Sequence, residues 1–283
     1  MRIAVTGSNG KLGSATVERL RADGHEVIGF DLGGTPGEGF TRVDLTDYGQ
    51  TLDSFLGVTA RHAGLDAIVH MAAIPVNGLV PDVTTFHNNM TVSFNVFQAA
   101  MRAGISTIVY ASSITAMGFP FEEAPAFFPV DESATAANNT YGLVKVMEEA
   151  MVAQLVRWDP NLSITALRYT NVTVAGEYDR FAERAGDPAY RRDLIWSYID
   201  ARDGAAAVSL ALDAATPGLE VYNIAASDTG LSVPSATLVA DAFPGVPVTK
   251  QLGQFETLMS IDKARARLGF EPQHLWRSEL GLS

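Results

Sequence analysis

RIAVTGSNGKLGSATVERL, residues 2–20, joins a short β-branched run to a glycine-rich turn and then to a segment with helical periodicity. The turn has the form TGxxGxxG, and a helix is expected to begin at about Lys11. Glycines permit a tight turn and a close approach of the backbone to a pyrophosphate, which then lies at the positive end of the helix dipole. The stretch therefore predicts a dinucleotide-binding loop, with cofactor contacts from Gly7, Asn9, Gly10, Lys11, Leu12 and Gly13.

Asp31 lies eighteen residues after Gly13, at the end of the second predicted strand. Its carboxylate can accept hydrogen bonds from both hydroxyls of an adenosine ribose and would repel a 2′-phosphate, and no arginine adjoins it in the sequence. NAD is therefore the expected cofactor, rather than NADP. The alternative is that Asp31 only caps a turn at the strand end.

Asp44 and Leu45 follow a third short strand and are expected to hold the adenine. The carboxylate would meet the exocyclic amine, and the Leu45 side chain would pack on the ring. An aspartate at this point can equally serve as a turn or N-cap residue.

Short apolar runs alternate with segments of helical periodicity along the first 170 residues. This alternation is typical of an α/β fold of the Rossmann type, a doubly wound parallel sheet with helices on both faces. Residues 1–170 are expected to form the NAD-binding domain, and residues 171–283 a small substrate-binding lobe interleaved with it. The expected strands are Arg2–Thr6, Glu26–Asp31, Ala67–Met71, Thr107–Ser112 and Ser163–Arg168, and the best-marked helices are Asn89–Ala103, Tyr141–Trp158 and the short Asp262–Leu268.

Composition excludes several classes of function. The 283 residues carry a net charge of −12 with no basic stripe, which disfavours nucleic acids and anionic membranes as partners. Cysteine is absent, which rules out thiol chemistry, and the five histidines show no ligand spacing, so no metal site is expected. His70, at the end of an apolar strand, is interpreted as a hydrogen-bonded core residue. No apolar run is long enough to span a bilayer, and Met1 leads directly into the first strand, so a cytoplasmic location is expected.

Tyr141 and Lys145 lie four residues apart, so both side chains project from one face of a helix. A neighbouring ammonium favours the phenolate form of a tyrosine, which can then act as a base. Ser113 lies at the end of the fifth strand, at the edge of the sheet where ligands collect in such folds. These three residues are the candidate catalytic group.

Taken together, the motifs resemble those of the extended short-chain dehydrogenases in the NAD-dependent epimerase/dehydratase superfamily. The resemblance covers roughly Met1 to Asn171. It rests on TGxxGxxG, Asp31, His70-Met71-Ala72-Ala73, NMTVSFNVFQAA at residues 89–100, Ala111-Ser112-Ser113, Tyr141 with Lys145, and Leu167-Arg168-Tyr169-Thr170-Asn171, all in the order of the family.

The resemblance implies that Tyr141 is the acid/base on the reacting hydroxyl, that Lys145 lowers its pKa and holds the nicotinamide ribose, and that Ser113 hydrogen-bonds the substrate oxygen. It also implies a homodimer through the two long helices. The further cofactor contacts that it implies are Met71, Ala72, Ala73, Asn89 and Tyr169, beside Tyr141 and Lys145 themselves, and the substrate contacts are Ser113, Thr115, Asn171 and Arg180. Asn89 and Asn171 could instead serve only to satisfy backbone groups of a helix start or a loop.

Three departures from the family pattern bear on the reaction. Dehydratases have an acidic pair after the catalytic hydroxyl residue, whereas Ile114 and Thr115 follow Ser113 here, which disfavours dehydration. Only about thirty residues separate Asn171 from Tyr198, which is short for a nucleotide-diphosphate pocket and resembles the compact uronate dehydrogenases. Their Ser-Asn-His run is nevertheless absent.

Four arginines, at positions 180, 184, 191 and 192, gather in the segment after Asn171. They are expected either to clamp a carboxylate or phosphate or to lie on a solvated surface. The leading hypothesis is an NAD-dependent oxidoreductase acting on a small sugar or sugar acid. The alternatives are a sugar epimerase that uses the same residues and a non-catalytic NAD sensor.

Overall fold

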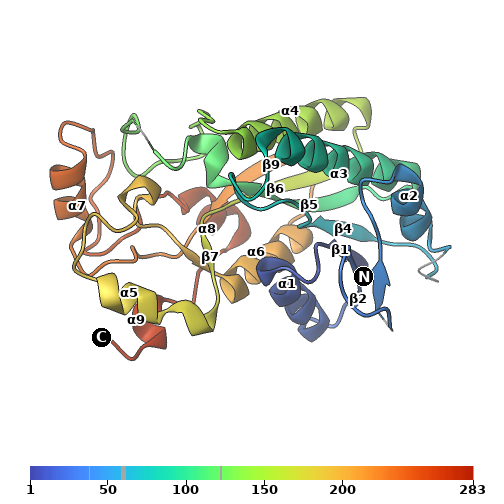
Figure 1. Cartoon of the computed structure of the whole chain (residues 1–283), viewed down its shortest axis with the longest axis horizontal. Coiled ribbons are helices and arrows are strands. Elements are labelled where there is room, and N and C mark those ends of the chain that lie inside the picture. Colours follow the sequence, from blue (N-terminus) through green and yellow to red (C-terminus); the bar gives the residue numbers. More distant parts are fainter. Residues whose placement is uncertain (38, 59–61, 122, 283) are drawn as a thin grey trace.

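The computed structural model describes residues 1–37, 39–58, 62–121 and 123–282. Its centre is a seven-stranded parallel sheet in the order β3-β2-β1-β4-β5-β6-β9 (Figure 1). Adjacent side chains of the central strands enter opposite cores, because Ile3 and Val5 pack on one face of the sheet and Ala4 on the other. The strands are β1 (Arg2–Thr6), β2 (Glu26–Asp31), β3 (Phe40–Arg42), β4 (Ala67–His70), β5 (Thr107–Ser113), β6 (Ser163–Tyr169) and β9 (Gly218–Ile224). The predicted Rossmann-type fold class is confirmed.

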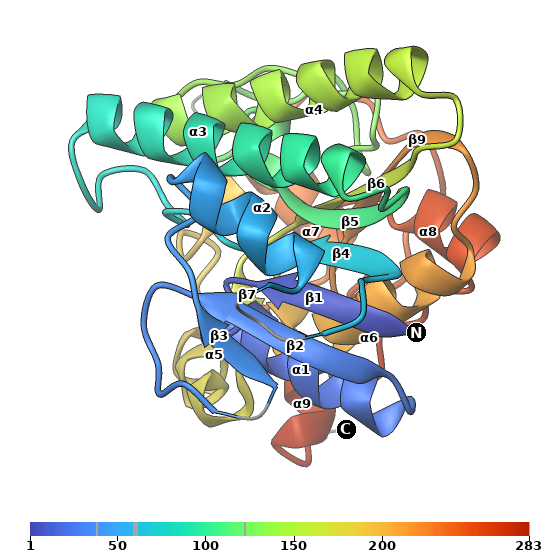
Figure 2. The same cartoon turned by 90° about the vertical axis from the view of Figure 1, so that its right-hand side faces the viewer.

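Helices cover both faces of this sheet (Figure 2). Helices α2 (Tyr48–Leu56), α3 (Asp82–Arg102) and α4 (Thr140–Trp158) lie on one face, and α1 (Lys11–Ala22) packs with α6 (Ala201–Asp213) on the other. The apolar spacing in α1 explains its orientation, because its buried residues Gly13, Thr16, Val17 and Leu20 share one side of the helix. Two sets of crossover helices therefore enclose the strands, as the alternation in the sequence predicts.

One predicted helix boundary was wrong. Helix α3 begins at Asp82, seven residues before the predicted start at Asn89. Pro81 occupies the N-cap position and Asp82 lies in the first turn, where a proline-led start and an acidic side chain are both favourable. Asn89 is therefore an interior residue of the helix.

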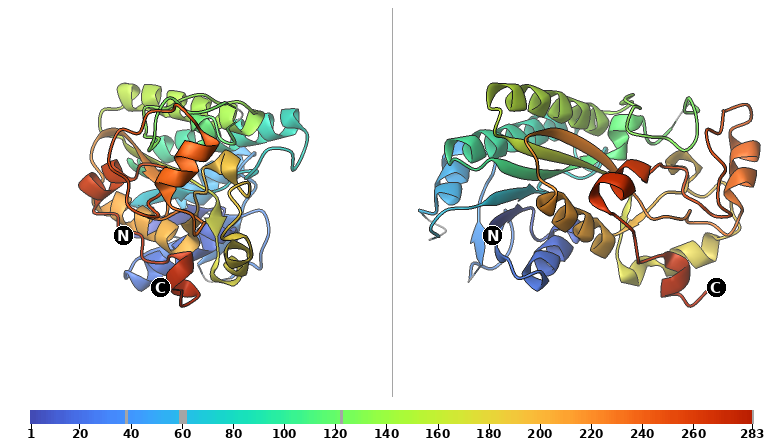
Figure 3. Two further views of the ribbon diagram at one scale, coloured as in Figure 1. Left: turned by 90° about the vertical axis from the view of Figure 1, so that its left-hand side faces the viewer. Right: turned by 180° about the vertical axis from the view of Figure 1, so that it is seen from behind.

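Most of the remaining elements gather at one end of the sheet, beyond the carboxyl ends of its strands (Figure 3). A two-stranded parallel pair crosses this region, while α6 and β9 return the chain to the main sheet. The elements here are η1 (Ile114–Met117), β7 (Val172–Thr173), η2 (Ala175–Glu177), α5 (Asp179–Arg184), η3 (Arg192–Leu194), β8 (Ile199–Asp200), α7 (Ser235–Ala242) and α9 (Trp276–Glu279). Helix α8 (Asp262–Leu268) packs instead beside the sheet, against β9 and α6.

Among the helices of the described ranges, none has the length and apolar character needed to cross a bilayer.

Candidate active site

The loop between β1 and α1 requires glycine at two of its positions. Gly7 has φ +67°, and a Cβ there would lie 2.7 Å from the backbone nitrogen of Ala72. A Cβ on Gly13 would overlap the carbonyl group of Gly7. Gly10 differs, since a Cβ there would meet only the Gly7 carbonyl oxygen, at 3.4 Å. Two glycines thus close the turn itself, whereas Gly10 leaves open space where the loop meets the N-terminus of α1.

A cavity of about 280 Å³ lies beside this loop, between β2 and the segment that leads to β3. Ser8, Asn9, Gly34 and Phe40 are among the residues that line it. The Ser8 hydroxyl is buried and has no hydrogen-bond partner among the described residues. A polar atom left unsatisfied beside a glycine-rich turn fits the adenosine and phosphate end of a dinucleotide, which offers many hydrogen-bonding oxygens.

Asp31 organises this pocket from the end of β2. Its carboxylate accepts hydrogen bonds from the Asn9 backbone nitrogen at 2.9 Å and from the Gly33 backbone nitrogen at 3.4 Å. The bond to Gly33 is the turn cap considered above, and the bond to Asn9 ties the phosphate loop to the strand end. Although no arginine adjoins Asp31 in the sequence, the pairing of β2 with β3 sets Arg42 opposite it, where the Arg42 Nε donates to the Leu32 carbonyl oxygen at 2.8 Å.

Asp44 and Leu45 have local partners in the structure. The Asp44 Oδ1 accepts from the Thr46 backbone nitrogen at 2.9 Å and from the Thr46 hydroxyl at 2.6 Å, as a turn aspartate does. Leu45 is buried in the core beneath α2 and α3. Their adenine contacts remain a prediction.

The three candidate catalytic residues converge at the carboxyl edge of the sheet. Tyr141 lies in the first turn of α4, whose N-cap residue Asn139 accepts the Gly142 backbone N–H at 2.8 Å. A Cβ on Gly142 would lie 2.6 Å from the Thr115 carbonyl oxygen, so glycine lets α4 approach η1 closely. Ser113 ends β5, and its hydroxyl accepts the Thr115 N–H at 3.1 Å. It also lies close enough to Tyr141 to act on the pKa of the phenol.

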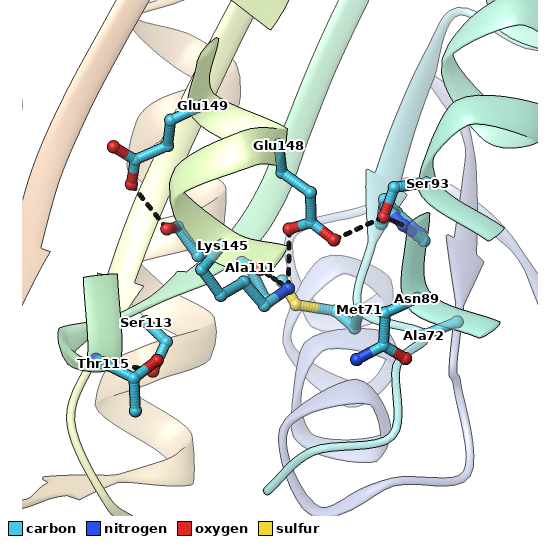
Figure 4. A network of polar contacts seen from close by, with 12 residues as sticks. Met71, Ala72, Asn89, Ser93, Ala111, Ser113, Thr115, Lys145, Glu148 and Glu149 are labelled. Carbon is cyan, nitrogen blue, oxygen red and sulfur yellow. Dashed lines mark hydrogen bonds and ion pairs between the residues drawn. The ribbon is translucent and has the colours of Figure 1, made fainter. Parts of the chain in front are cut away.

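Lys145 is almost fully buried, and Figure 4 shows its side chain directed towards Glu148 and Ala111. Its Nζ lies 5.6 Å from the centroid of the Tyr141 ring. It donates to the Ala111 carbonyl oxygen at 2.9 Å and to the Glu148 carboxylate at 2.8 Å. The lysine thus lies within electrostatic range of the phenol and is held in one orientation.

Burial raises the pKa of Tyr141, while Lys145 and Ser113 act to lower it and Glu148 acts to raise it further. The net direction is upward. For Lys145, burial lowers the pKa, but the Glu148 carboxylate outweighs it, so the pKa of the lysine is raised. At neutral pH the lysine is therefore charged and the tyrosine is a phenol, which equips Tyr141 to donate a proton.

Several predicted cofactor contacts have structural partners. Asn89 is fully buried, and its side-chain amide makes two hydrogen bonds with the backbone of Ile74. The amide oxygen accepts the Ile74 N–H at 2.8 Å, and the amide nitrogen donates to the Ile74 carbonyl oxygen at 3.0 Å. This geometry matches the backbone-satisfying alternative. The Tyr169 hydroxyl donates to the Gly204 carbonyl oxygen at 3.0 Å, so its side chain is anchored to α6. Met71, Ala72 and Ala73 lie half-buried just after β4, beside the phosphate loop.

On the predicted substrate side, Thr115 carries a buried hydroxyl without a hydrogen-bond partner in the described chain. Asn171 is exposed, and its side-chain oxygen accepts from Arg191 at 3.4 Å. Arg180 donates to the Thr173 hydroxyl at 3.0 Å. The guanidinium carbons of Arg180 and Arg191 lie 5.3 and 5.4 Å from the centroid of the same ring, that of Phe181.

The other two arginines of the segment are engaged elsewhere. Arg184 pairs with Asp187 at 3.6 Å, and Arg192 stacks over Phe243 and donates to the Ala242 carbonyl oxygen at 2.6 Å. Only two of the four arginines therefore gather beside Asn171.

A family model for the NAD-dependent epimerase/dehydratase family matches residues 3–225. The chain belongs to this family. It is similar to a short-chain dehydrogenase/reductase superfamily protein from Agrobacterium tumefaciens whose crystal structure contains NAD, with 26% identity over 99% of this chain and 95% of the other, and a TM-score of 0.72. The predicted family and the NAD cofactor are both confirmed.

Curated relatives of the family include the UDP-glucose 4-epimerase of Bacillus subtilis, 31% identical over 65% of this chain and 56% of the relative. The matched region thus spans only about half of that protein. The UDP-glucose 4-epimerase of Corynebacterium glutamicum is 24% identical over 97% of this chain and 92% of the relative. The family assignment makes this chain an NAD-dependent enzyme, and dehydrogenation and epimerisation both remain open to it.

Sequence reasoning missed the two glutamates that follow Lys145. Glu149 forms a two-pronged ion pair with Arg168, at 2.9 and 2.7 Å, and accepts the Ser112 hydroxyl at 2.6 Å. Glu148 is completely buried against Lys145. The signal was present, because two adjacent carboxylates in an otherwise apolar helix need buried partners.

Proposed function

We propose that this member of the family catalyses NAD-dependent oxidoreduction at a hydroxyl or carbonyl carbon of a small sugar or sugar acid. The observation that carries the proposal is the convergence of Ser113, Tyr141 and Lys145 at the carboxyl edge of the sheet, next to the dinucleotide loop. The Gly7 and Gly13 contacts and the unsatisfied Ser8 hydroxyl support NAD in that loop.

In this proposal each of the three residues has a role in proton transfer. In the oxidising direction the Tyr141 oxygen takes the proton of the substrate hydroxyl, and in the reducing direction the phenol returns it to the carbonyl oxygen. The Ser113 hydroxyl accepts the Thr115 N–H, so its own proton is available to donate to the same substrate oxygen. Lys145 stabilises negative charge on the Tyr141 oxygen. NAD, when bound, supplies the acceptor for the hydride that leaves the substrate carbon.

Two features support a small acidic substrate. Arg180 and Arg191 bring two positive charges beside Asn171, and the Nε of each is buried without a hydrogen-bond partner in the described part of the chain. Burial and the neighbouring Arg180 lower the pKa of Arg191, although Tyr190 and Asp193 act to raise it and Glu177 pairs with Arg180 at 3.4 Å. A carboxylate or phosphate group on the substrate would relieve this repulsion.

The second candidate is a sugar epimerase, favoured by the UDP-glucose 4-epimerases among the relatives. The same residues would serve, with the hydride returned to the opposite face of the transient carbonyl. The two reactions differ in net cofactor change, because only a dehydrogenase accumulates NADH.

Absorbance at 340 nm separates these candidates. We would mix the purified protein with NAD and a panel of aldoses, uronates and polyols, and test UDP-glucose for conversion to its C4 epimer. A dehydrogenase gives NADH with at least one free sugar, and Tyr141→Phe lowers that rate by about 10²- to 10⁴-fold. Epimer formation without NADH would replace the proposal by the second candidate.

We also propose that α3 and α4 form a homodimer contact. Their outer surfaces expose large apolar side chains, with Phe94 47%, Leu143 46% and Met147 37% exposed. Apolar surface of this kind on neighbouring helices is typical of an interface. Light scattering of the purified protein tests this, and a monomeric mass contradicts it.

A further inference from the structure

Glu148 is the most deeply buried carboxylate near the catalytic group. It is 0% exposed, and it follows Lys145 by three residues on the same face of α4. One carboxylate oxygen accepts from Lys145 Nζ at 2.8 Å and the other from the Ser93 hydroxyl of α3 at 2.7 Å (Figure 4). Since an isolated buried carboxylate is strongly unfavourable, these two donors account for its presence in the core.

The hydrogen-bond chain behind Ser93 has a defined direction. The Thr6 hydroxyl oxygen accepts the backbone N–H groups of Met71 and Ala72, at 3.2 and 3.3 Å, so its single proton is donated to His70 Nδ1 at 2.7 Å. Burial and the nearby Lys145 lower the pKa of His70 to about 3, so the ring is neutral and carries its proton on Nε2. His70 is thus the hydrogen-bonded core residue expected from the sequence.

From His70 the donors continue towards the carboxylate. His70 Nε2 lies 3.2 Å from the Ser93 hydroxyl and donates to it, and Ser93 donates in turn to Glu148. Every proton in the series from Thr6 to Ser93 is therefore donated in one direction, towards Glu148. The series begins at the residue before Gly7, so it joins the phosphate loop to the catalytic lysine through side chains of β1, β4, α3 and α4.

Lys145 has three N–H donors, of which Ala111 and Glu148 occupy two. The third remains for the Tyr141 side of the site. The position of the ammonium is thus set by the Ala111 carbonyl group and the Glu148 carboxylate together.

Charge balance gives Glu148 a second effect. Lys145 and Glu148 form a neutral pair next to Tyr141, and on the same helix Glu149 is neutralised by Arg168 of β6. The other titratable groups facing the pair are the neutral His70 of β4 and Tyr110 of β5, whose pKa burial raises well above its ordinary value. The Glu148 carboxylate therefore offsets part of the positive field of Lys145 at the phenol, where the effect of the lysine is the larger of the two.

We propose that Glu148 is a positioning residue that holds Lys145 and offsets part of its charge, so that Tyr141 forms less phenolate at a given pH than it would beside an unopposed lysine. This inference rests on the proposed function of Tyr141 and Lys145. Glu148 thereby favours the phenol, the form of Tyr141 that can protonate a carbonyl oxygen.

The first test uses Glu148→Gln without cofactor or substrate. Tyrosinate absorbance near 295 nm is followed against pH in this variant and in the wild-type protein. From each curve we subtract that of the same protein with Tyr141→Phe added, so that only the Tyr141 signal remains. Removal of the charge is expected to increase the Tyr141 phenolate population at a given pH by about tenfold, equivalent to about one pKa unit. An unchanged difference titration in a variant that keeps the wild-type melting temperature would overturn the inference.

The second test adds the cofactor to the same variant. NAD is titrated into the wild-type protein and into Glu148→Gln by calorimetry at pH 8 in two buffers of different ionisation enthalpy, with Tyr141→Phe as the control. The variant is expected to release more protons on binding NAD than the wild-type protein, and the release is expected to vanish in the control. Equal proton release by the two proteins contradicts the inference, whereas absent turnover with every sugar would contradict only the proposed function.

Discussion

The cofactor side and the proposed substrate side of this protein are held together by different kinds of contact. On the cofactor side, β1, β4 and β5 pair in register through their backbones, and the loop after β1 is shaped by glycine. On the substrate side, β7 and β8 have only two residues each. That region is stabilised by side-chain packing, in one cluster that contains Tyr178, Phe181, Tyr198 and Trp276.

Polar links complete that cluster. The Tyr198 hydroxyl donates to Asp228 at 2.6 Å and accepts the Trp276 N–H at 2.9 Å, while Arg277 pairs with Asp228. These contacts join positions up to 78 residues apart in the sequence. Backbone pairing and glycine geometry therefore shape the cofactor loop, whereas the proposed substrate side depends on a few specific side-chain contacts between distant parts of the chain.

The largest effect is expected from a methyl group in the glycine loop. Gly13→Ala sets a Cβ against the Gly7 carbonyl group, so the loop must move and NAD affinity is expected to fall by more than about 100-fold, with a loss of stability. Gly10→Ala is the matched control, because its Cβ has open space. It is expected to keep the wild-type melting temperature and to weaken NAD binding only by its approach to the phosphates. Calorimetric titration measures the NAD affinity of each variant, and thermal unfolding measures its melting temperature. Equal melting temperatures for the two variants would show that the loop adapts.

On the substrate side, the largest effect is expected from Trp276→Ala. The indole is fully buried, stacks on Phe181 with ring centroids 6.1 Å apart, and donates to the Thr229 carbonyl oxygen at 3.0 Å. Its removal is expected to cost about 3–5 kcal/mol of unfolding free energy. NAD affinity of the folded fraction is expected to remain, since Trp276 packs in a cluster separate from the cores on the two faces of the sheet. Urea unfolding monitored beside NADH fluorescence checks this, and parallel loss of both would show that the two sides are one cooperative unit.

The sequence predicted more on the cofactor side than on the proposed substrate side. Gly7, Gly13 and Asp31 could be located because their roles depend on backbone geometry within one strand-turn-helix unit. The roles of Asn89 and Tyr169 could not be settled, since their partners Ile74 and Gly204 are brought near only by the tertiary fold.

The substrate side was least predictable. Four neighbouring arginines looked alike in the sequence, and only the positions of Phe181, Asp187 and Phe243 separate those beside Asn171 from those on the surface. A pattern of residue types predicts chemistry, but the direction of a long side chain depends on neighbours that are distant in the chain.

A smaller effect is expected at the ribose contact. Asp31→Ala removes the predicted acceptor for the adenosine ribose and the hydrogen bond to Asn9, so the Kd for NAD is expected to rise about tenfold, or about 1.4 kcal/mol. Because Arg42 lies opposite Asp31, binding of NADP is expected to improve at the same time. Calorimetric titration with NAD and with NADP gives the ratio of the two affinities. A variant that loses both affinities equally contradicts the ribose assignment.

The smallest effect concerns pH and the substrate side alone. Burial raises the pKa of Asp228 from 3.8 to about 6 despite its contacts with Tyr198 and Arg277. The folded protein therefore holds this proton more tightly than the unfolded chain, so the contribution to stability is complete below about pH 4 and is lost as pH rises through 6. Between pH 5 and 7 the loss is about 1 kcal/mol. Asp228→Asn cannot titrate, so its unfolding free energy minus that of the wild-type protein is expected to rise by this amount over the same interval in urea. A flat difference would mean that the Arg277 ion pair keeps Asp228 ionised throughout, and that this part of the lobe is stabilised by charge as well as by aromatic packing.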